Sequence, residues 1–341
     1  MRDLLKTIAT LCAVLFVAAG VPVLILFNIE RGAFESATYK QAFENQRLYE
    51  RMPAILGTTL ASTLSQNAGM VPFLRELTPE EWQLTISTLL PPEELRAMTD
   101  QTLDSTFDYL NFRSKTVVIS LLPVKAQLTG PAGVNVVRQF LAAQPACTVE
   151  QLTQMALGMI SGNITLCNPP EEAMGLLEPF IQSQLQTINN TFPNEISLVP
   201  ATESGTPSDP RLQLHLVRSG IQFAPFFVFL LLPLIAVLAV RNIRDLLVWW
   251  GWPLLVTGLV SGLIGLVGSP LVGWVLQLLI QFQVAAILPP VLASSIAETA
   301  SAVASQMLLP VILQGFGMAV TGLGMVVLSF LFPTRTIIAV P

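Results

Sequence analysis

The stretch "LLVWWGWPLLVTGLVSGLIGLV", residues 246–267, decides the fold class of this chain, because it contains no charged side chain. About 20 helical residues are enough to cross a hydrocarbon core of roughly 30 Å. Trp249, Trp250 and Trp252 stand near its start, where aromatic side chains anchor spanning helices at the membrane interface. This stretch therefore predicts an integral membrane protein.

The rest of the chain strengthens this prediction. Charged residues make up 11% of the 341 residues, against about 25% in a typical soluble domain. The deficit is concentrated in long uncharged runs, and Glu298 is the only charged residue between Asp245 and Arg335. We place four spans, near Ile8–Phe27, Ile221–Val240, Leu247–Val267 and Leu308–Phe332.

The first span has two interpretations, an uncleaved anchor or a cleaved signal peptide. A signal peptide is suggested by the basic residues Arg2 and Lys6 and by the small residues "AAG" at 18–20. The apolar run nevertheless continues through "VPVLILF", 21–27, which is long for the core of a signal peptide. We expect an uncleaved anchor.

Basic residues in the short flanks of the spans predict the orientation. Arg2 and Lys6 precede the first span, "RNIRD" (241–245) joins the second and third, and Arg335 follows the fourth. Short basic flanks remain in the cytoplasm. We expect a multi-pass protein of the cell membrane with both termini cytoplasmic and residues 31–219 extracytoplasmic.

The segment "GWVLQLLIQFQVAAIL", 273–288, allows two interpretations. It is uncharged and could form a fifth, short span. Gln277, Gln281 and Gln283 argue against exposure to lipid, because amide groups are costly there. We therefore expect interfacial amphipathic helices over 271–304.

The chain divides into three parts. Residues 1–30 hold the cytoplasmic tip and first span, 31–219 the extracytoplasmic domain, and 220–341 the membrane domain. The extracytoplasmic part has a mainly helical pattern, and the β-branched stretches 115–121 and 195–201 could pair as a small two-stranded ribbon. The fold class is a mainly α integral membrane protein.

Two local patterns set expectations for helices in the extracytoplasmic part. Apolar residues at three-to-four spacing predict a helix over 36–64, which Pro53 should kink or break. Thr78 followed three residues later by Glu81 is a capping box and predicts a helix start.

Cys147 and Cys167 are the only cysteine pair in the extracytoplasmic part. Because thiols outside the cytoplasm are commonly oxidised, we expect a disulfide, with two free thiols as the alternative. Such a loop closure contributes about 3 kcal/mol through the unfolded state. Cys12 lies inside the first span and is expected to serve packing.

No set of residues suggests catalysis, a metal site or a cofactor, so we expect a non-enzymatic protein. His215 is the only histidine and lies shortly before the second span. It is either an ordinary interfacial residue, which we favour, or a pH-sensitive group at the membrane surface. The acidic balance of the extracytoplasmic part disfavours nucleic acid as a partner.

Small residues mark the third and fourth spans as packing partners. Gly258, Gly262 and Gly265 recur in the third span, and Gly315 and Ala319 are four apart in the fourth. Small residues at this spacing let helices approach closely. The contact could form within one chain or between copies of it.

The order of one span, a large outer domain and three further spans resembles the permease subunits of ABC systems of the macrolide-exporter and cell-division type. This resemblance covers topology only. It implies a cytoplasmic coupling element between the second and third spans, where this chain has only the five residues "RNIRD".

Three functions are therefore considered. The first is a non-enzymatic membrane protein whose extracytoplasmic domain binds a partner or ligand, or supports an envelope assembly. The alternatives are a homo-oligomeric channel or transporter-like pore and an ABC-permease-like subunit. The expected partners are the lipid bilayer and either further copies of the chain or another membrane protein.

Overall fold

A computed structural model describes residues 2–64, 77–154, 167–199, 209–279 and 290–332. The chain folds into two compact units. One, here called the four-helix unit, gathers the two ends of the chain. The other, here called the middle unit, is built mainly from residues 43–204.

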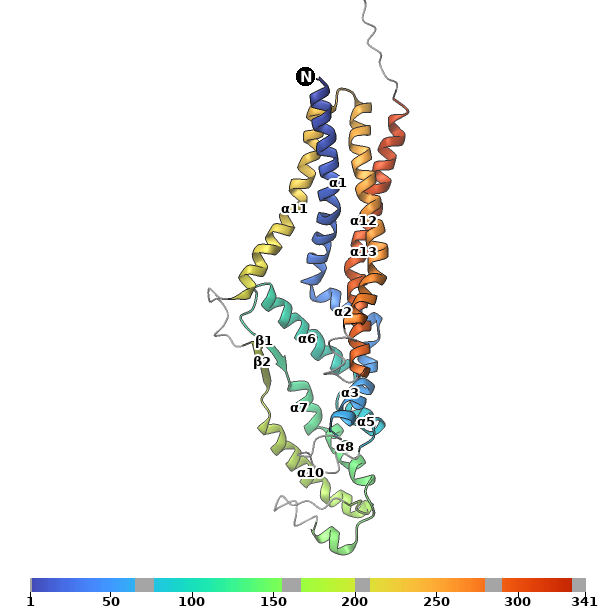
Figure 1. Cartoon of the computed structure of the whole chain (residues 1–341). Helices are drawn as coiled ribbons and strands as arrows, with labels where there is room; N and C mark the ends of the chain where they lie inside the picture. The colour runs from blue at the N-terminus through green and yellow to red at the C-terminus, as the bar shows by residue number, and fades with distance from the viewer. Residues whose placement is uncertain (1, 65–76, 155–166, 200–208, 280–289, 333–341) are drawn as a thin grey trace, which may run out of the picture. The chain divides into compact units, whose positions relative to one another are not determined.

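Four long helices form the four-helix unit and run side by side (Figure 1). All four are long and apolar enough to cross a membrane, which confirms the coarse fold class and is compatible with a multi-pass membrane protein. They are α1 (Arg2–Ala33), α11 (Pro210–Ala239), α12 (Ile243–Leu279) and α13 (Pro290–Ser329).

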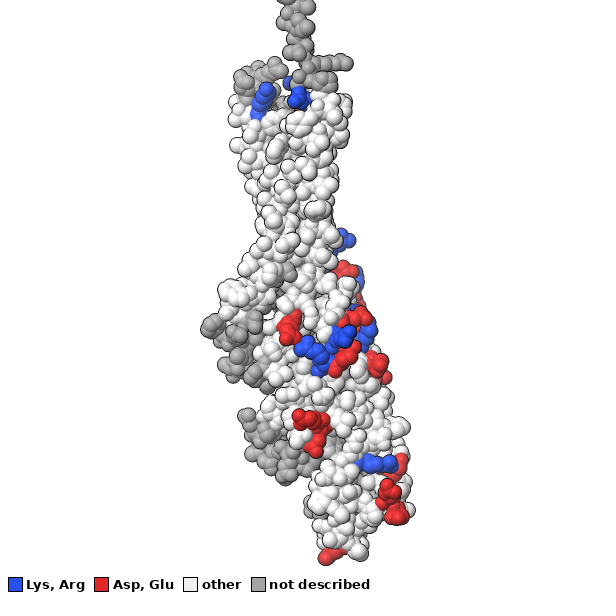
Figure 2. All heavy atoms as spheres, turned by 90° about the vertical axis from the view of Figure 1, so that its right-hand side faces the viewer, with Lys and Arg blue, Asp and Glu red and all other residues white. Residues whose placement is uncertain are grey.

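The four helices alternate in direction. The start of α1, the turn between α11 and α12 and the end of α13 lie at one end of this unit (Figure 1). Figure 2 shows basic side chains at this end, followed by a belt without charged side chains. The basic residues near the start of α1, including Lys6, therefore lie at the same end of the unit as Arg241 in the turn between α11 and α12.

The ends of α12 and α13 differ from the predicted spans. With about 1.5 Å per residue, α12 is roughly 56 Å long and α13 roughly 60 Å, twice the roughly 30 Å of a hydrocarbon core. Instead of ending near Val267 before separate helices over 271–304, α12 continues through Pro270. Neighbouring helices can hold a helix together across a proline that removes one backbone hydrogen bond.

The glutamines that suggested an interfacial helix are only partly covered by the structure. Gln277 lies on the backbone of α12, and nothing is described of its side chain. Gln281 and Gln283 lie outside the described residues. The choice between an interfacial segment and a fifth span therefore stays a prediction.

An apolar core joins three helices of the four-helix unit. Phe16 of α1 is almost fully buried, and Val228, Leu232 and Leu254 pack around it from α11 and α12. The indole nitrogen of Trp250 donates to the carbonyl oxygen of Leu232 at 2.9 Å, which links α12 to α11. This core fixes the three helices around the cavity described below.

The described residues of the middle unit form helices and a small sheet. The strands β1 (Val117–Ser120) and β2 (Glu195–Val199) pair antiparallel, which confirms the predicted two-stranded ribbon. The helices are α2 (Ser36–Asn45), which begins in the four-helix unit, α3 (Leu48–Leu64), α5 (Pro79–Leu89), α6 (Pro92–Leu110), α7 (Leu122–Thr129), α8 (Pro131–Ala142) and α10 (Glu171–Thr191).

Two local predictions in this part have different outcomes. The capping box is confirmed, because Glu81 donates its backbone N–H to the Thr78 hydroxyl at 3.2 Å and accepts from the Thr78 N–H at 2.8 Å. Pro53 does not break the helix, and a kink there stays a prediction. The chain instead breaks before α3, where Arg47 adopts a left-handed backbone with φ of 47°, and α3 continues through Pro53.

A hydrogen bond connects α3 with α6. The Tyr49 hydroxyl donates to Oδ1 of Asp100 at 3.2 Å, and the Arg96 guanidinium lies 6.0 Å from the centre of the Tyr49 ring. Burial, together with the negative charge of Asp100, raises the pKa of Tyr49 well above its ordinary value. The tyrosine therefore remains a neutral donor over the whole physiological range.

The expected disulfide between Cys147 and Cys167 is formed, with the two Cα atoms 5.0 Å apart. It belongs to the hydrophobic core of the middle unit, where Cys167 is almost fully buried beside Leu141 and Leu177. The bond closes the chain between α8 and α10. Cys12 is a buried free cysteine in α1, and it lies outside this core.

Candidate functional site

Helices α12 and α13 approach so closely that glycine is required at their crossing. A Cβ atom on Gly315 would lie 2.7 Å from the backbone nitrogen of Gly262 and 2.9 Å from the carbonyl oxygen of Gly258. One on Gly265 would lie 2.9 Å from the Ile312 side chain. Ala319 is buried at the same crossing, so the structure brings all five predicted packing residues together within one chain.

Helices α12 and α13 also approach closely at Gly251 and Gly322, which are not among the predicted packing residues. A Cβ atom on Gly322 would lie 2.7 Å from the carbonyl oxygen of Gly251. Gly251 and Gly258 are seven residues apart, and so are Gly315 and Gly322. A seven-residue repeat of small residues is the signal that could have identified this second contact, because it keeps one helix face against its neighbour over two turns.

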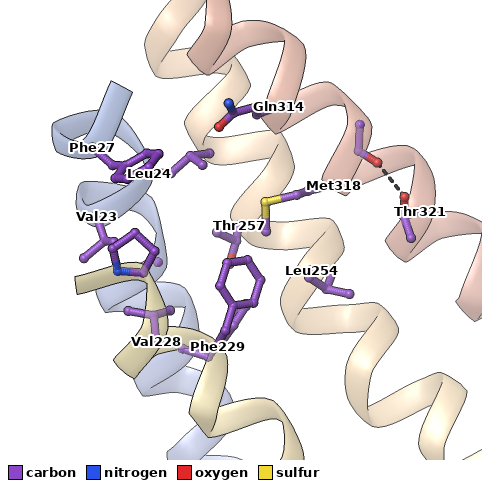
Figure 3. Close-up of a pocket in the computed structure, with 14 residues that line it drawn as sticks. Val23, Leu24, Phe27, Val228, Phe229, Leu254, Thr257, Gln314, Met318 and Thr321 are labelled. Atoms are coloured by element: carbon purple, nitrogen blue, oxygen red, sulfur yellow. Dashed lines mark hydrogen bonds between the residues drawn. The ribbon is translucent and has the colours of Figure 1, made fainter. Parts of the chain in front are cut away.

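A cavity of about 440 Å³ lies among all four helices of this unit (Figure 3). This volume is within the range of about 300–1,000 Å³ that is usual for sites binding small molecules. Among the residues that the structure describes, no charged side chain lines it. Its walls are mainly apolar and include Phe16, Leu24, Phe27, Phe229, Leu254 and Met318.

Thr257 is a polar group in this wall without a hydrogen-bond partner. The residue is 1% exposed, and its hydroxyl oxygen has no partner in the described part of the chain. Its carbonyl oxygen, by contrast, accepts from the Ser261 hydroxyl. A buried hydroxyl left without a partner costs about 1–3 kcal/mol, and burial keeps this oxygen out of reach of a molecule in the cavity.

Gln314 brings an amide group to the same cavity, toward the Asn28 end of α1. The Asn28 amide nitrogen donates to Oε1 of Gln314 at 2.9 Å and to the carbonyl oxygen of Leu24 at 2.8 Å. The side-chain nitrogen of Gln314 makes no hydrogen bond to the residues that the structure describes. Two N–H donors are therefore available at this end of the cavity.

A buried ion pair joins α1 to α11 close to that end. The Arg218 Nε atom donates to Oε1 of Glu30 at 2.8 Å, and the two side chains are 14% and 5% exposed. Gln222 donates to the same oxygen at 3.0 Å, and the Arg218 guanidinium lies 3.9 Å from the centre of the Phe34 ring. These contacts hold α11 against the end of α1.

We expect Glu30→Gln to lower the free energy of unfolding of the four-helix unit by about 1 kcal/mol, because charged hydrogen bonds contribute more than neutral ones. Glutamine keeps the accepting oxygen and removes the charge opposite Arg218. Thermal unfolding of the full chain in detergent measures the change. Glu35→Gln is the matched control, since Glu35 is exposed. Equal melting temperatures for the two variants would contradict this role of the pair.

A second cavity, of about 540 Å³, lies between α1 and α12 and is lined by residues including Val14, Trp249 and Trp252. Its polar side chains are the Trp249 and Trp252 indoles and Thr10, and the Thr10 hydroxyl donates to the carbonyl oxygen of Lys6 at 3.0 Å. The Thr10 hydroxyl is thus already bonded within its own helix. The second cavity therefore supports a specific ligand less strongly than the first cavity does.

The remaining predicted site residue, His215, lies on α11 and is exposed. It does not line either cavity. Among the described residues, no three His, Cys, Asp or Glu side chains gather in a way that could hold a metal ion. The structure thus points to the first cavity as the candidate site.

Comparison of the chain with known protein families, with curated proteins and with solved structures found no match. The structure defines a helical protein with a disulfide-bonded middle unit and four helices that are long and apolar enough to span a membrane.

Proposed function

We propose that this protein is a non-enzymatic, multi-pass membrane protein that binds a hydrophobic ligand in the cavity of its four-helix unit. The observation that carries this proposal is the cavity of about 440 Å³ with apolar walls and the side-chain nitrogen of Gln314, which makes no hydrogen bond to the described residues. Apolar pockets with a few placed polar groups are typical of small-molecule sites.

In this proposal the four-helix unit lies in the cell membrane and the middle unit is extracytoplasmic. Both termini are cytoplasmic, together with the turn between α11 and α12 that carries Arg241 and Arg244. The disulfide Cys147–Cys167 supports an oxidising compartment for the middle unit. In that arrangement, lipid surrounds the four helices that enclose the cavity.

The middle unit supports a second binding role, toward a protein partner. Helix α10 buries Leu177, Ile181 and Leu185 but exposes Leu176 at 76% and Phe180 at 53% on a neighbouring face. Exposed apolar side chains that gather on one element are typical of protein interfaces. This observation favours a partner for the extracytoplasmic domain, as the sequence suggests.

The two alternative functions receive less support. A homo-oligomer that pairs through the glycines of α12 and α13 is disfavoured, because Gly258 and Gly315 already pack these two helices against each other within one chain. In addition, none of the described residues that line the cavity is ionisable, and ion pathways usually need such a residue. An ABC-permease-like role is disfavoured because only the residues 240–242 separate α11 from α12, which leaves no coupling helix.

Filling the cavity tests the proposal. Gly317 lines the cavity, and a Cβ atom added there would meet nothing within 4 Å, so Gly317→Trp places an indole in the ligand space. We expect native mass spectrometry of the detergent-extracted full chain to show bound hydrophobic molecules in the wild type and at least tenfold less in this variant.

Gly324→Trp is the matched control. Gly324 is on the same helix, is equally open at its Cβ position and does not line the cavity. The Gly324→Trp variant should therefore retain as many bound hydrophobic molecules as the wild type. If both tryptophan variants retain the same molecules as the wild type, the cavity is not a binding site and the proposed function is wrong.

A further inference from the structure

Resting on the proposed function, we propose the chemical class of the ligand. The cavity holds one acyl chain of an anionic amphiphile, whose carbonyl oxygen accepts from Gln314 and whose negative charge pairs with Arg31. The source of the acyl chain is either an anionic phospholipid of the bilayer or a free fatty acid. These sources share the acyl chain, the carbonyl group and the anion.

The walls of the cavity select the acyl chain. Aromatic and aliphatic side chains from α1, α11, α12 and α13 form them, among them Phe27, Phe229 and Leu254 (Figure 3). In a bilayer the surrounding medium is itself made of acyl chains, so a chain enters such a space without being desolvated from water. An acyl chain also fits better than a charged or strongly polar molecule, because none of the described residues that line the cavity is charged.

The amide of Gln314 selects the carbonyl group. Its oxygen is already occupied by Asn28, and its nitrogen has no partner among the described residues, so it offers donors and needs an acceptor. Gln314 is exposed although it belongs to a helix apolar enough to span a membrane. An ester or carboxyl oxygen is the acceptor that lies next to every acyl chain.

Arg31 supplies the positive charge. Gly20, Leu24 and Phe27 line the cavity from α1, and Arg31 follows on the same face, four residues after Phe27 and roughly 6 Å further along the helix. Its side chain is exposed and makes no ion pair with the described residues. The neighbouring Glu30 is held by Arg218 instead, so no acidic side chain among the described residues occupies Arg31, and it is available to an anion from outside the chain.

Binding of defined lipids to the full chain tests this assignment. The delipidated protein is titrated in detergent with 1-palmitoyl-2-oleoyl phosphatidylglycerol, with the phosphatidylcholine of the same chains and with palmitate, and bound molecules are counted by native mass spectrometry. We expect one tight site, a preference for the anionic lipid over phosphatidylcholine of about threefold, and competition between palmitate and phosphatidylglycerol. The better-bound anion identifies the source of the chain.

Two variants separate the contacts. Arg31→Gln should remove the preference for the anionic lipid, and Arg241→Gln should keep it, because Arg241 lies at the opposite end of the four-helix unit. Gln314→Leu should weaken the binding of all three probes about fivefold, the usual effect of one hydrogen bond.

The outcomes distinguish this inference from the proposed function. Equal affinities for anionic and zwitterionic lipid in the wild type would overturn it, and so would identical effects of Arg31→Gln and Arg241→Gln. If Gly317→Trp still abolishes binding in either case, the cavity remains a hydrophobic site and only the ligand class is wrong. If Gly317→Trp has no effect, the inference and the proposed function both fail.

Discussion

The Gly315→Leu variant is expected to lose the packed pair of helices α12 and α13. Its added Cβ atom would overlap backbone atoms of Gly258 and Gly262, which no side-chain rotation can relieve. Helix separation would then expose Val311 and Ala319, both now buried. Overpacking against side chains costs about 1–3 kcal/mol, so an overlap with the backbone should cost at least about 3 kcal/mol.

Thermal unfolding and protease resistance of the full chain in mild detergent measure this loss. Gly324→Leu is the matched control, because the same side chain at this position of α13 meets nothing within 4 Å of its Cβ atom. We expect Gly315→Leu to unfold far below the wild type and Gly324→Leu to remain close to it. Equal stability of the two variants would show that α12 and α13 do not cross at Gly315.

Removing the disulfide is expected to have the second large effect. Cys147 and Cys167 are 20 residues apart in sequence, and closing a loop of this size contributes about 3 kcal/mol through the unfolded chain. Cys167 is also packed among Val134, Leu141 and Leu177 in the core of the middle unit. The double variant Cys147→Ala/Cys167→Ala should therefore destabilise the middle unit by about 3 kcal/mol.

Urea titration with brief proteolysis of the full chain reports on this unit, because cleavage requires its local unfolding. The midpoint should fall in the double variant, and a reductant should lower the wild-type midpoint to a similar value without changing that of the variant. Cys12→Ala is the control, since Cys12 lies in α1 and outside this core. A wild-type midpoint insensitive to reductant would contradict a stabilising disulfide.

The four long apolar helices could be predicted from the sequence because charge is absent over whole helix lengths. The run Ile8–Phe27 falls within α1, and the run Ile221–Val240 falls within α11 except for its last residue, which caps the helix. Helix ends were less predictable. Pro270 and Pro53 are strong breakers in isolation, yet α12 and α3 continue through them, because packing against neighbouring helices outweighs the loss of one backbone hydrogen bond.

The candidate site could not be predicted, because its signal is the meeting of single residues from distant segments. Asn28 and Gln314 are separated by 286 positions. In the sequence, Asn28 is a single polar residue at the end of an uncharged stretch, and Gln314 is a single polar residue inside another. Thr257 is an ordinary residue in sequence, and only the packing of four helices leaves its hydroxyl unpartnered beside a cavity. The disulfide was predictable, since the chain offers only one pair outside the spans.

Photo-crosslinking with a diazirine-bearing fatty acid tests binding in the cavity most directly, with the full chain reconstituted into lipid vesicles. We predict saturable labelling concentrated on residues that line the cavity, between Phe16 and Phe27 of α1 and between Gln314 and Thr321 of α13. Unlabelled palmitate should compete, and Gly317→Trp should remove the label. Unsaturable labelling spread over exposed positions outside the cavity, such as Leu263 and Leu323, with no enrichment at the cavity, would contradict the proposed binding site.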